Sequence, residues 1–129
     1  MKAKNIILFV ILISTLILTV SCEANTSYIE AVKLEEKIIN QEQIQLLDVR
    51  TPEEFQEGHL ENAININWND PNFIQQTHHL DKTQPLYIYC KSGRRSAAAA
   101  QQLNEEGFEV YDLKGGIDNW KQNNHPIIK

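Results

Sequence analysis

The segment that decides the fold of this chain reads Leu86-Tyr87-Ile88-Tyr89-Cys90-Lys91-Ser92-Gly93-Arg94-Arg95-Ser96. Its first four residues favour a β-strand, whereas its second half is polar and basic and contains a glycine. Directly after it, residues 97–103 have the highest helix propensity in the chain. The pattern predicts a strand, a tight loop and a helix, with Cys90 at the C-terminal end of the strand. In an open α/β sheet, that edge is where ligands bind.

The predicted loop has the chemistry of an anion site. Its backbone N–H groups and the unpaired N–H groups of the following helix are expected to point into one concavity. The helix dipole adds positive charge there, and Lys91, Arg94 and Arg95 add three cations. We therefore expect Cys90 to react as a thiolate and residues 91–95, including Ser92 and Gly93, to hold a small oxyanion. The alternative, a buried and unreactive core cysteine, gives no reason for these neighbours.

The composition indicates one globular domain. The chain has 129 residues, of which 42% are hydrophobic and 22% are charged, enough for a packed core. Its formal net charge of −5 argues against nucleic acid as a partner. The adjacent His78 and His79 have no further ligand at metal-binding spacing on the same predicted element, so we expect no metal.

The first 21 residues are predicted to be an export signal. A short basic segment, residues 1–5, precedes an apolar run over residues 6–20. As a helix this run spans about 23 Å, which is short of the roughly 30 Å core of a bilayer. The run ends in Leu18-Thr19-Val20-Ser21-Cys22, which resembles the lipobox of bacterial lipoproteins, although Thr19 departs from the usual leucine.

We therefore expect Cys22 to be lipidated and residues 22–27 to be a tether. The protein is then expected to be exported and anchored in a bacterial cell envelope, in the periplasm or on the outer surface. An ordinary cleaved signal peptide and an uncleaved anchor remain the alternatives. With Cys22 lipidated, Cys90 is the one free thiol left in the chain, and no structural disulfide is expected.

The remaining pattern alternates strands with helices. Strands are predicted over 28–30, 44–49, 63–66, 86–89 and 108–111, and helices over 32–39, 52–57, within 69–77, after 96 and over 117–122. Thr51 is expected to cap the second helix, with Pro52 at its first position. This alternation predicts an α/β fold with a mostly parallel sheet covered by helices on both faces.

Six motifs in this order carry a family resemblance: Asp48-Val49-Arg50, Glu54-Phe55, Gly58-His59-Leu60, Ala63-Ile64-Asn65-Ile66, Cys90 to Ser96, and Leu113-Lys114-Gly115-Gly116-Ile117-Asp118-Asn119-Trp120. They resemble the single-domain rhodanese (thiosulfate sulfurtransferase) family over residues 28–129. Two positions depart from the family pattern, Asn62 in place of glycine and Leu60 in place of isoleucine. Asparagine tolerates the left-handed conformation, so the turn is expected to survive.

The resemblance implies a rhodanese-like fold with a five-stranded central sheet, and neither a metal nor an organic cofactor. It implies that Cys90 is the nucleophile, that residues 91–95 bind the donor, and that Asp48, Arg50 and Ser96 support the loop. Cys90 would take a sulfane sulfur from thiosulfate or a related anion as a persulfide and pass it to a thiol or to cyanide. A monomer is expected.

Two alternatives to this activity stay open. One is a rhodanese-fold interaction module without catalysis. The other is a cysteine-loop phosphatase, whose arginine stands six residues after the cysteine; here that position is Ser96, and Arg95 comes one residue early. The shorter loop suits a sulfur atom better than a phosphoryl group. A thioredoxin-like role needs a second nearby cysteine, which Cys90 lacks.

Overall fold

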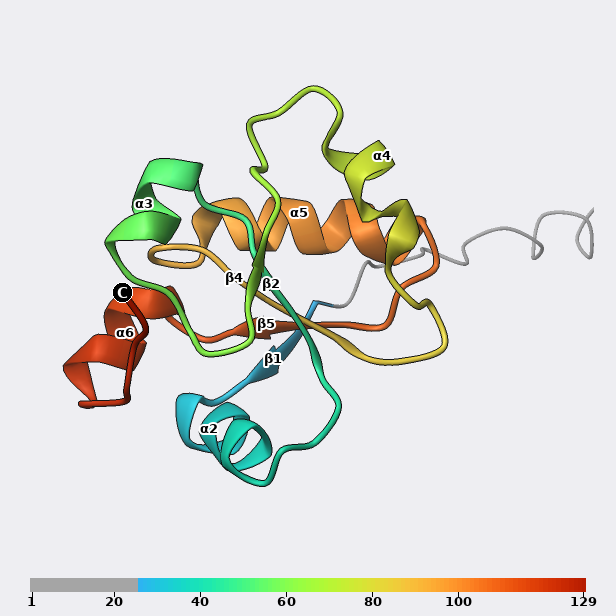
Figure 1. The fold of residues 1–129 in the computed structure, drawn as a ribbon. Coiled ribbons are helices and arrows are strands. Elements are labelled where there is room, and N and C mark those ends of the chain that lie inside the picture. The colour runs from blue at the N-terminus through green and yellow to red at the C-terminus, as the bar shows by residue number, and fades with distance from the viewer. Residues whose placement is uncertain (1–25) are drawn as a thin grey trace, which may run out of the picture.

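The structure is a computed structural model that describes residues 26–129 (Figure 1). A parallel five-stranded sheet forms its centre, in the order β1-β5-β4-β2-β3. The strands are β1 (Ser27–Ile29), β2 (Gln45–Asp48), β3 (Ile64–Asn65), β4 (Leu86–Tyr89) and β5 (Val110–Leu113). The predicted α/β class and five-stranded sheet are confirmed, and every strand pair in the sheet is parallel. The predicted signal peptide and Cys22 lie outside the described residues.

Helices cover both faces of this sheet. They are α2 (Ala31–Ile39), α3 (Pro52–Glu57), α4 (Phe73–Gln76), the 3-10 helix η1 (Thr77–His79), α5 (Arg94–Glu105) and α6 (Gly116–Gln122). Figure 1 shows α5 and α2 on opposite sides of the strands. Each side has its own buried cluster, one with the apolar residues of α5 and the other with those of α2 and α6. Within residues 26–129, no helix is both long enough and apolar enough to cross a membrane.

The central strand β4 is buried along its whole length, as its apolar sequence predicts. Leu86 and Ile88 pack into the cluster beneath α5, whereas Tyr87 and Tyr89 pack into the cluster beneath α2 and α6. This alternation follows from the two-residue period of a strand. Because β4 lies between β2 and β5, the residue that follows it leaves the sheet at the centre of its C-terminal edge.

Turn residues determine where two helices, α3 and α5, begin. Thr51 caps α3, as predicted, and forms a reciprocal capping box with Glu54. Helix α5 begins at Arg94, three residues before the predicted alanine run, because Gly93 takes a left-handed conformation and acts as its N-cap. Arg94 and Arg95 thus belong to the first turn of a helix instead of to the loop.

The segment before η1 is less helical than the sequence predicts. A helix was expected within 69–77, but α4 covers only Phe73–Gln76. The N–H groups of Asn69 and Asn72 donate to the side chains of Asn67 and Asp70, at 3.0 and 2.8 Å. Such side-chain bonds compete with the helix for the backbone. At the start of the chain, Ser27 begins β1 instead of ending the predicted tether.

Candidate active site

Cys90 directly follows β4 and is 1% exposed. Its Sγ accepts a hydrogen bond from the N–H of Gly93 at 3.1 Å, and the Ser96 hydroxyl oxygen lies 3.3 Å from it. The left-handed backbone of Gly93, with φ of 109°, turns the loop back over the sulfur. Two donors are therefore aimed at Sγ from the loop and from the first turn of α5, which is how a protein stabilises charge on sulfur.

The N-terminus of α6 orients the peptides of the loop. The N–H groups of Ile117 and Asp118 donate to the carbonyls of Cys90 and Lys91, each at 3.0 Å. With these carbonyls bound to α6, the N–H groups of the loop are left for another acceptor. Within residues 26–129, no hydrogen bond is donated by the backbone N–H groups of Lys91, Ser92, Arg94, Arg95 or Ser96. Five N–H groups of the loop and of the first turn of α5 are therefore left without an acceptor among the described residues, and could bind an anion.

Gly116 is required for this contact between α6 and the loop. Its φ of 62° lies in the left-handed region, and a Cβ there would overlap the Lys91 carbonyl and lie 2.7 Å from the Cys90 carbonyl oxygen. Any other residue would push α6 away from the loop. The double glycine was recognised in the sequence as a family motif, but its contact with Cys90 was not predicted.

Arg95 is engaged in an ion pair that the sequence analysis missed. Its guanidinium donates two hydrogen bonds, of 2.7 and 2.8 Å, to the carboxylate of Glu54 in α3. The bonds from Arg95, with further bonds from Thr51, lower the pKa of Glu54 to about 2. Arg95 was expected to bind the donor anion directly, but its charge is already balanced, so it ties α3 to the start of α5.

The remaining cations near Cys90 are Lys91 in the loop and Arg94 at the start of α5. Both side chains are exposed, and within the described residues neither forms a salt bridge. A cavity of about 240 Å³ adjoins Lys91 and is lined by Arg50, Glu54, Glu57, Lys91, Ile117, Asp118 and Lys121. Its lining carries three cations and three carboxylates, so the cavity has no excess of positive charge.

Asp48 and Arg50 form a buried ion pair at the end of β2, beside the loop. The Arg50 guanidinium donates to the Asp48 carboxylate at 2.6–3.1 Å and to the Gly58 carbonyl at 2.7 Å. Burial works against the charge of Arg50, but the bonds to Asp48 outweigh it and raise its pKa. The guanidinium also lies 5.6 Å from the ring of Tyr89. The pair therefore supports the active-site loop indirectly, by fixing the neighbouring strand end and the turn at Gly58.

That turn contains the two departures from the family pattern. Asn62 has a φ of 65°, so the left-handed turn survives as predicted. Leu60 is fully buried, and its N–H donates to the hydroxyl of Tyr89 at 3.1 Å. Neither departure touches Cys90.

Asp112, near the end of β5, is a buried carboxyl that the sequence analysis missed. It is 1% exposed, and its Oδ1 is the one buried side-chain oxygen or nitrogen in the described part of the chain without a hydrogen-bond partner. Burial raises the pKa of Asp112 to about 6, and the adjacent Ser96 hydroxyl partly offsets this rise. An acidic residue inside an otherwise apolar strand was the available signal.

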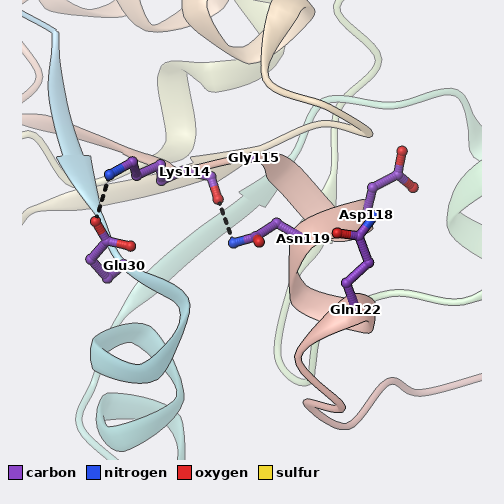
Figure 2. Close-up of a pocket in the computed structure, with 6 residues that line it drawn as sticks. All are labelled: Glu30, Lys114, Gly115, Asp118, Asn119 and Gln122. Carbon is purple, nitrogen blue, oxygen red and sulfur yellow. Dashed lines mark hydrogen bonds and ion pairs between the residues drawn. The ribbon is translucent and has the colours of Figure 1, made fainter.

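A second and larger cavity, of about 400 Å³, lies between the end of β1 and α6 (Figure 2). It contains an exposed ion pair of 2.9 Å between Lys114 and Glu30, and Asn119 donates to the Lys114 carbonyl at 3.1 Å. Its lining has neither a thiol nor a buried titratable group. The nucleophilic chemistry of this fold is therefore concentrated at Cys90.

A parallel α/β sheet whose central strand is directly followed by a cysteine, with a loop N–H bonded to its sulfur, is typical of cysteine-loop transferases and hydrolases. The comparison with known proteins is more specific, because the rhodanese-like domain family matches residues 30–123. The chain belongs to this family, and its role is sulfurtransferase-like.

Similar proteins agree with this assignment. The thiosulfate sulfurtransferase GlpE of Vibrio cholerae is 35% identical over 91 residues, which are 70% of this chain and 84% of that protein. The putative sulfurtransferase YtwF of Bacillus subtilis is 35% identical over 98 residues, 76% of this chain and 93% of that one. The uncharacterised B. subtilis protein YqhL is 42% identical over 77 residues, 59% of this chain and 60% of that protein. A rhodanese-related crystal structure from Thermoplasma volcanium aligns with a TM-score of 0.71 at 31% identity, covering 79% of this chain and 97% of that one.

Proposed function

We propose that this protein transfers a sulfane sulfur from thiosulfate or a related anion to a thiophilic acceptor through a persulfide on Cys90. The observation that carries the proposal is the pair of donors on Cys90 Sγ, the Gly93 N–H and the Ser96 hydroxyl, together with five nearby backbone N–H groups that have no partner among residues 26–129. Similarity to proteins named sulfurtransferases supports the class of reaction.

In the first half-reaction, the Cys90 thiolate attacks the outer sulfur of thiosulfate. A bond forms between Sγ and that sulfur, and the bond between the two sulfurs of thiosulfate breaks. Sulfite leaves with the electron pair, and Cys90 becomes a persulfide anion. Lys91 and Arg94 at the loop attract the dianionic donor, and the free N–H groups hold the negative charge as it moves to the terminal sulfur.

In the second half-reaction, a thiolate or cyanide attacks the terminal sulfur of the persulfide. The sulfur–sulfur bond at Cys90 breaks, the acceptor leaves as a persulfide or thiocyanate, and the Cys90 thiolate is regenerated. Cys90 is 1% exposed, so an acceptor has to reach a nearly buried group. This geometry favours small acceptors, or a protein thiol on a narrow protruding segment. No nucleic acid is required, and a monomer suffices.

The geometry gives less support to a phosphatase. In those enzymes the residue six positions after the cysteine is an arginine that contacts the phosphoryl group. Here Ser96 occupies this position with its hydroxyl next to Sγ, and Arg95 is held by Glu54. Neither the sixth position nor the neighbouring Arg95 therefore offers a free guanidinium for the phosphoryl oxygens.

We also propose that the protein is exported and anchored by a lipid on Cys22. The basis is the sequence of residues 1–22 alone: a basic start, an apolar run too short to span a bilayer comfortably, and Ser21 before Cys22. The rhodanese-like domain would then act at the surface of a membrane in the bacterial cell envelope.

Mass spectrometry after incubation with thiosulfate tests the proposed transfer. The intact protein should gain the mass of one sulfur atom, located on Cys90, and subsequent cyanide should remove it. Cys90→Ser should abolish the gain. If no sulfane donor adds sulfur to Cys90, the interaction-module alternative is favoured; turnover of aryl phosphates faster than sulfur transfer would favour the phosphatase.

A further inference from the structure

Asp112 lies on the same side of the sheet as Cys90. It pairs in register with Ile88, the residue two positions before Cys90. Ile88, Cys90 and Val110 belong to the buried cluster beneath α5, and Asp112 follows Val110 by two residues, so it faces α5 as well. The carboxyl is therefore buried between β5 and α5, in the layer from which Ser96 approaches the sulfur.

Apart from the Ser96 hydroxyl, the described surroundings of Asp112 do not stabilise its negative charge. Its Oδ1 has no hydrogen-bond partner among the described residues, and an isolated buried carboxylate is costly. The charged groups on neighbouring elements are directed elsewhere: Arg95 bonds Glu54, Lys114 bonds Glu30, and Arg94 is exposed. The titratable Tyr28, paired with Asp112 in β1, is 60% exposed. Within residues 26–129, the groups left near the carboxyl are the Ser96 hydroxyl and, beyond it, the Cys90 thiol.

Ser96 connects Asp112 to Cys90. Its hydroxyl oxygen lies 3.3 Å from Cys90 Sγ and 3.2 Å from the Gly93 carbonyl oxygen, and it adjoins the Asp112 carboxyl. A hydroxyl has a single proton to donate. An ionised Asp112 competes with the sulfur for that proton, whereas a protonated Asp112 can donate its own proton to the Ser96 oxygen. In the second case only the Gly93 carbonyl oxygen still competes with the sulfur for the Ser96 proton.

We infer that Asp112 is a positioning residue that controls, through Ser96, the ionisation of Cys90. At pH values between the two ionisations of the pair, the buried group of three residues holds one negative charge, on Asp112 when Cys90 is a thiol and on Cys90 when Asp112 is protonated. Interconversion moves a proton from Sγ to the Ser96 oxygen while the Ser96 proton passes to Asp112. The products are a thiolate, an unchanged serine and a neutral carboxylic acid. No oxidant or further reactant is needed.

This inference rests on the proposed nucleophilic role of Cys90, but its test does not require sulfur transfer. The rate of Cys90 alkylation by iodoacetamide, a neutral probe, is measured against pH on the whole protein. In the wild type, the logarithm of the rate should rise with pH, flatten over an interval that starts near pH 6 as Asp112 ionises, and rise again. The flat interval is expected because the new carboxylate disfavours the thiolate.

The variants separate this role from a structural one. Asp112→Asn, an isosteric and neutral replacement, should remove the flat interval and make alkylation at pH 7.5 several-fold faster than in the wild type. In a Ser96→Ala background, Asp112→Asn should change the rate less than twofold. Glu109→Gln, which removes an exposed carboxyl from the residue just before β5, is the matched control and should keep the flat interval.

A wild-type profile without the flat interval overturns the inference. This measurement does not depend on whether any variant folds. Unchanged or slower alkylation in Asp112→Asn overturns it too, and an equal effect with and without Ser96 rejects the connection through Ser96. Sulfur addition from thiosulfate is measured on the same samples. If the flat interval is present but no persulfide forms, the proposed function fails while the role of Asp112 stands.

Discussion

Arg95 in the first turn of α5 bonds Glu54 in α3 through both carboxylate oxygens, across 41 residues of sequence. Glu54 also closes the capping box of its own helix by accepting from the Thr51 N–H at 3.1 Å. One carboxylate therefore holds together the N-terminus of α3 and the start of the helix that follows the Cys90 loop. Arg95 is thus engaged in a structural contact, whereas Lys91 and Arg94 form no salt bridge within the described residues, and we predict that these two attract the donor.

Glu54→Gln should destabilise the protein at neutral pH by about 1 kcal/mol, because it replaces a partly exposed, two-point ion pair with a neutral contact. The pKa of Glu54 is lowered from 4.5 to about 2 in the folded state. Its stabilisation is therefore fully present above pH 4.5 and is lost as pH falls toward 2. Urea unfolding across this range should show the two proteins converging. Glu53→Gln in the same helix is the control, and an equal loss there would contradict the assignment.

Removing the free cations should weaken donor binding. Arg94→Ala is expected to raise the KM for thiosulfate a few-fold, and the Lys91→Ala/Arg94→Ala double variant about tenfold, with smaller effects on kcat. The effect should shrink in 1 M salt, where the screening length is about 3 Å. Lys33→Ala on α2 removes a cation on the opposite face of the sheet and should leave KM unchanged. A salt-independent loss would mean that these side chains act by shaping the loop.

Gly116→Ala should abolish most activity, because its Cβ would overlap the Lys91 carbonyl and displace the loop from α6. Gly107→Ala is the matched control: its φ of 97° is also left-handed, but its Cβ would meet only the Lys82 side chain at 4.0 Å. Both substitutions strain the backbone by about 1–2 kcal/mol. Thermal unfolding should therefore report a loss in both variants, whereas sulfur transfer should fall more than tenfold in Gly116→Ala alone. Equal activity in the two would show that the α6 contact is dispensable.

Arg50→Ala should lower the free energy of unfolding by about 3–5 kcal/mol, because it leaves the fully buried Asp48 carboxylate without its partner. Denaturant unfolding followed by tryptophan fluorescence measures this loss. Lys114→Ala breaks an exposed pair and should change the unfolding midpoint little. A small effect of Arg50→Ala would mean that water or another group compensates Asp48 in the variant.

Cys22→Ala should release the protein from the detergent phase in a phase-partitioning experiment on bacterial cells that express it. The expected cause is loss of the thiol to which the lipid is attached, so the wild type should partition into detergent. Sulfur transfer by Cys90 should be the same in both forms, because Cys22 would act only as an anchor. Equal partitioning of the two proteins would favour the cleaved or uncleaved signal alternatives.

Much of this fold could be predicted from local sequence. The apolar run before Cys90 and the alanine run after Ser96 define a strand and a helix by propensity, and the glycine between them marks a turn. Thr51 and Pro52 likewise start α3 through a cap formed within four residues. Local rules predicted less well where side chains compete for the backbone, as at Asn69 and Asn72, where the expected helix is shortened.

The sequence by itself thus determined the strand, loop and helix around Cys90, because adjacent residues and their backbone preferences specify these elements. Only the tertiary structure brings Glu54 to Arg95, the N-terminus of α6 to the carbonyls of Cys90 and Lys91, and Asp112 to the layer beneath Ser96. These contacts join segments on different strands and helices. They depend on the order and register of the parallel sheet, which long-range packing determines and local propensity does not encode.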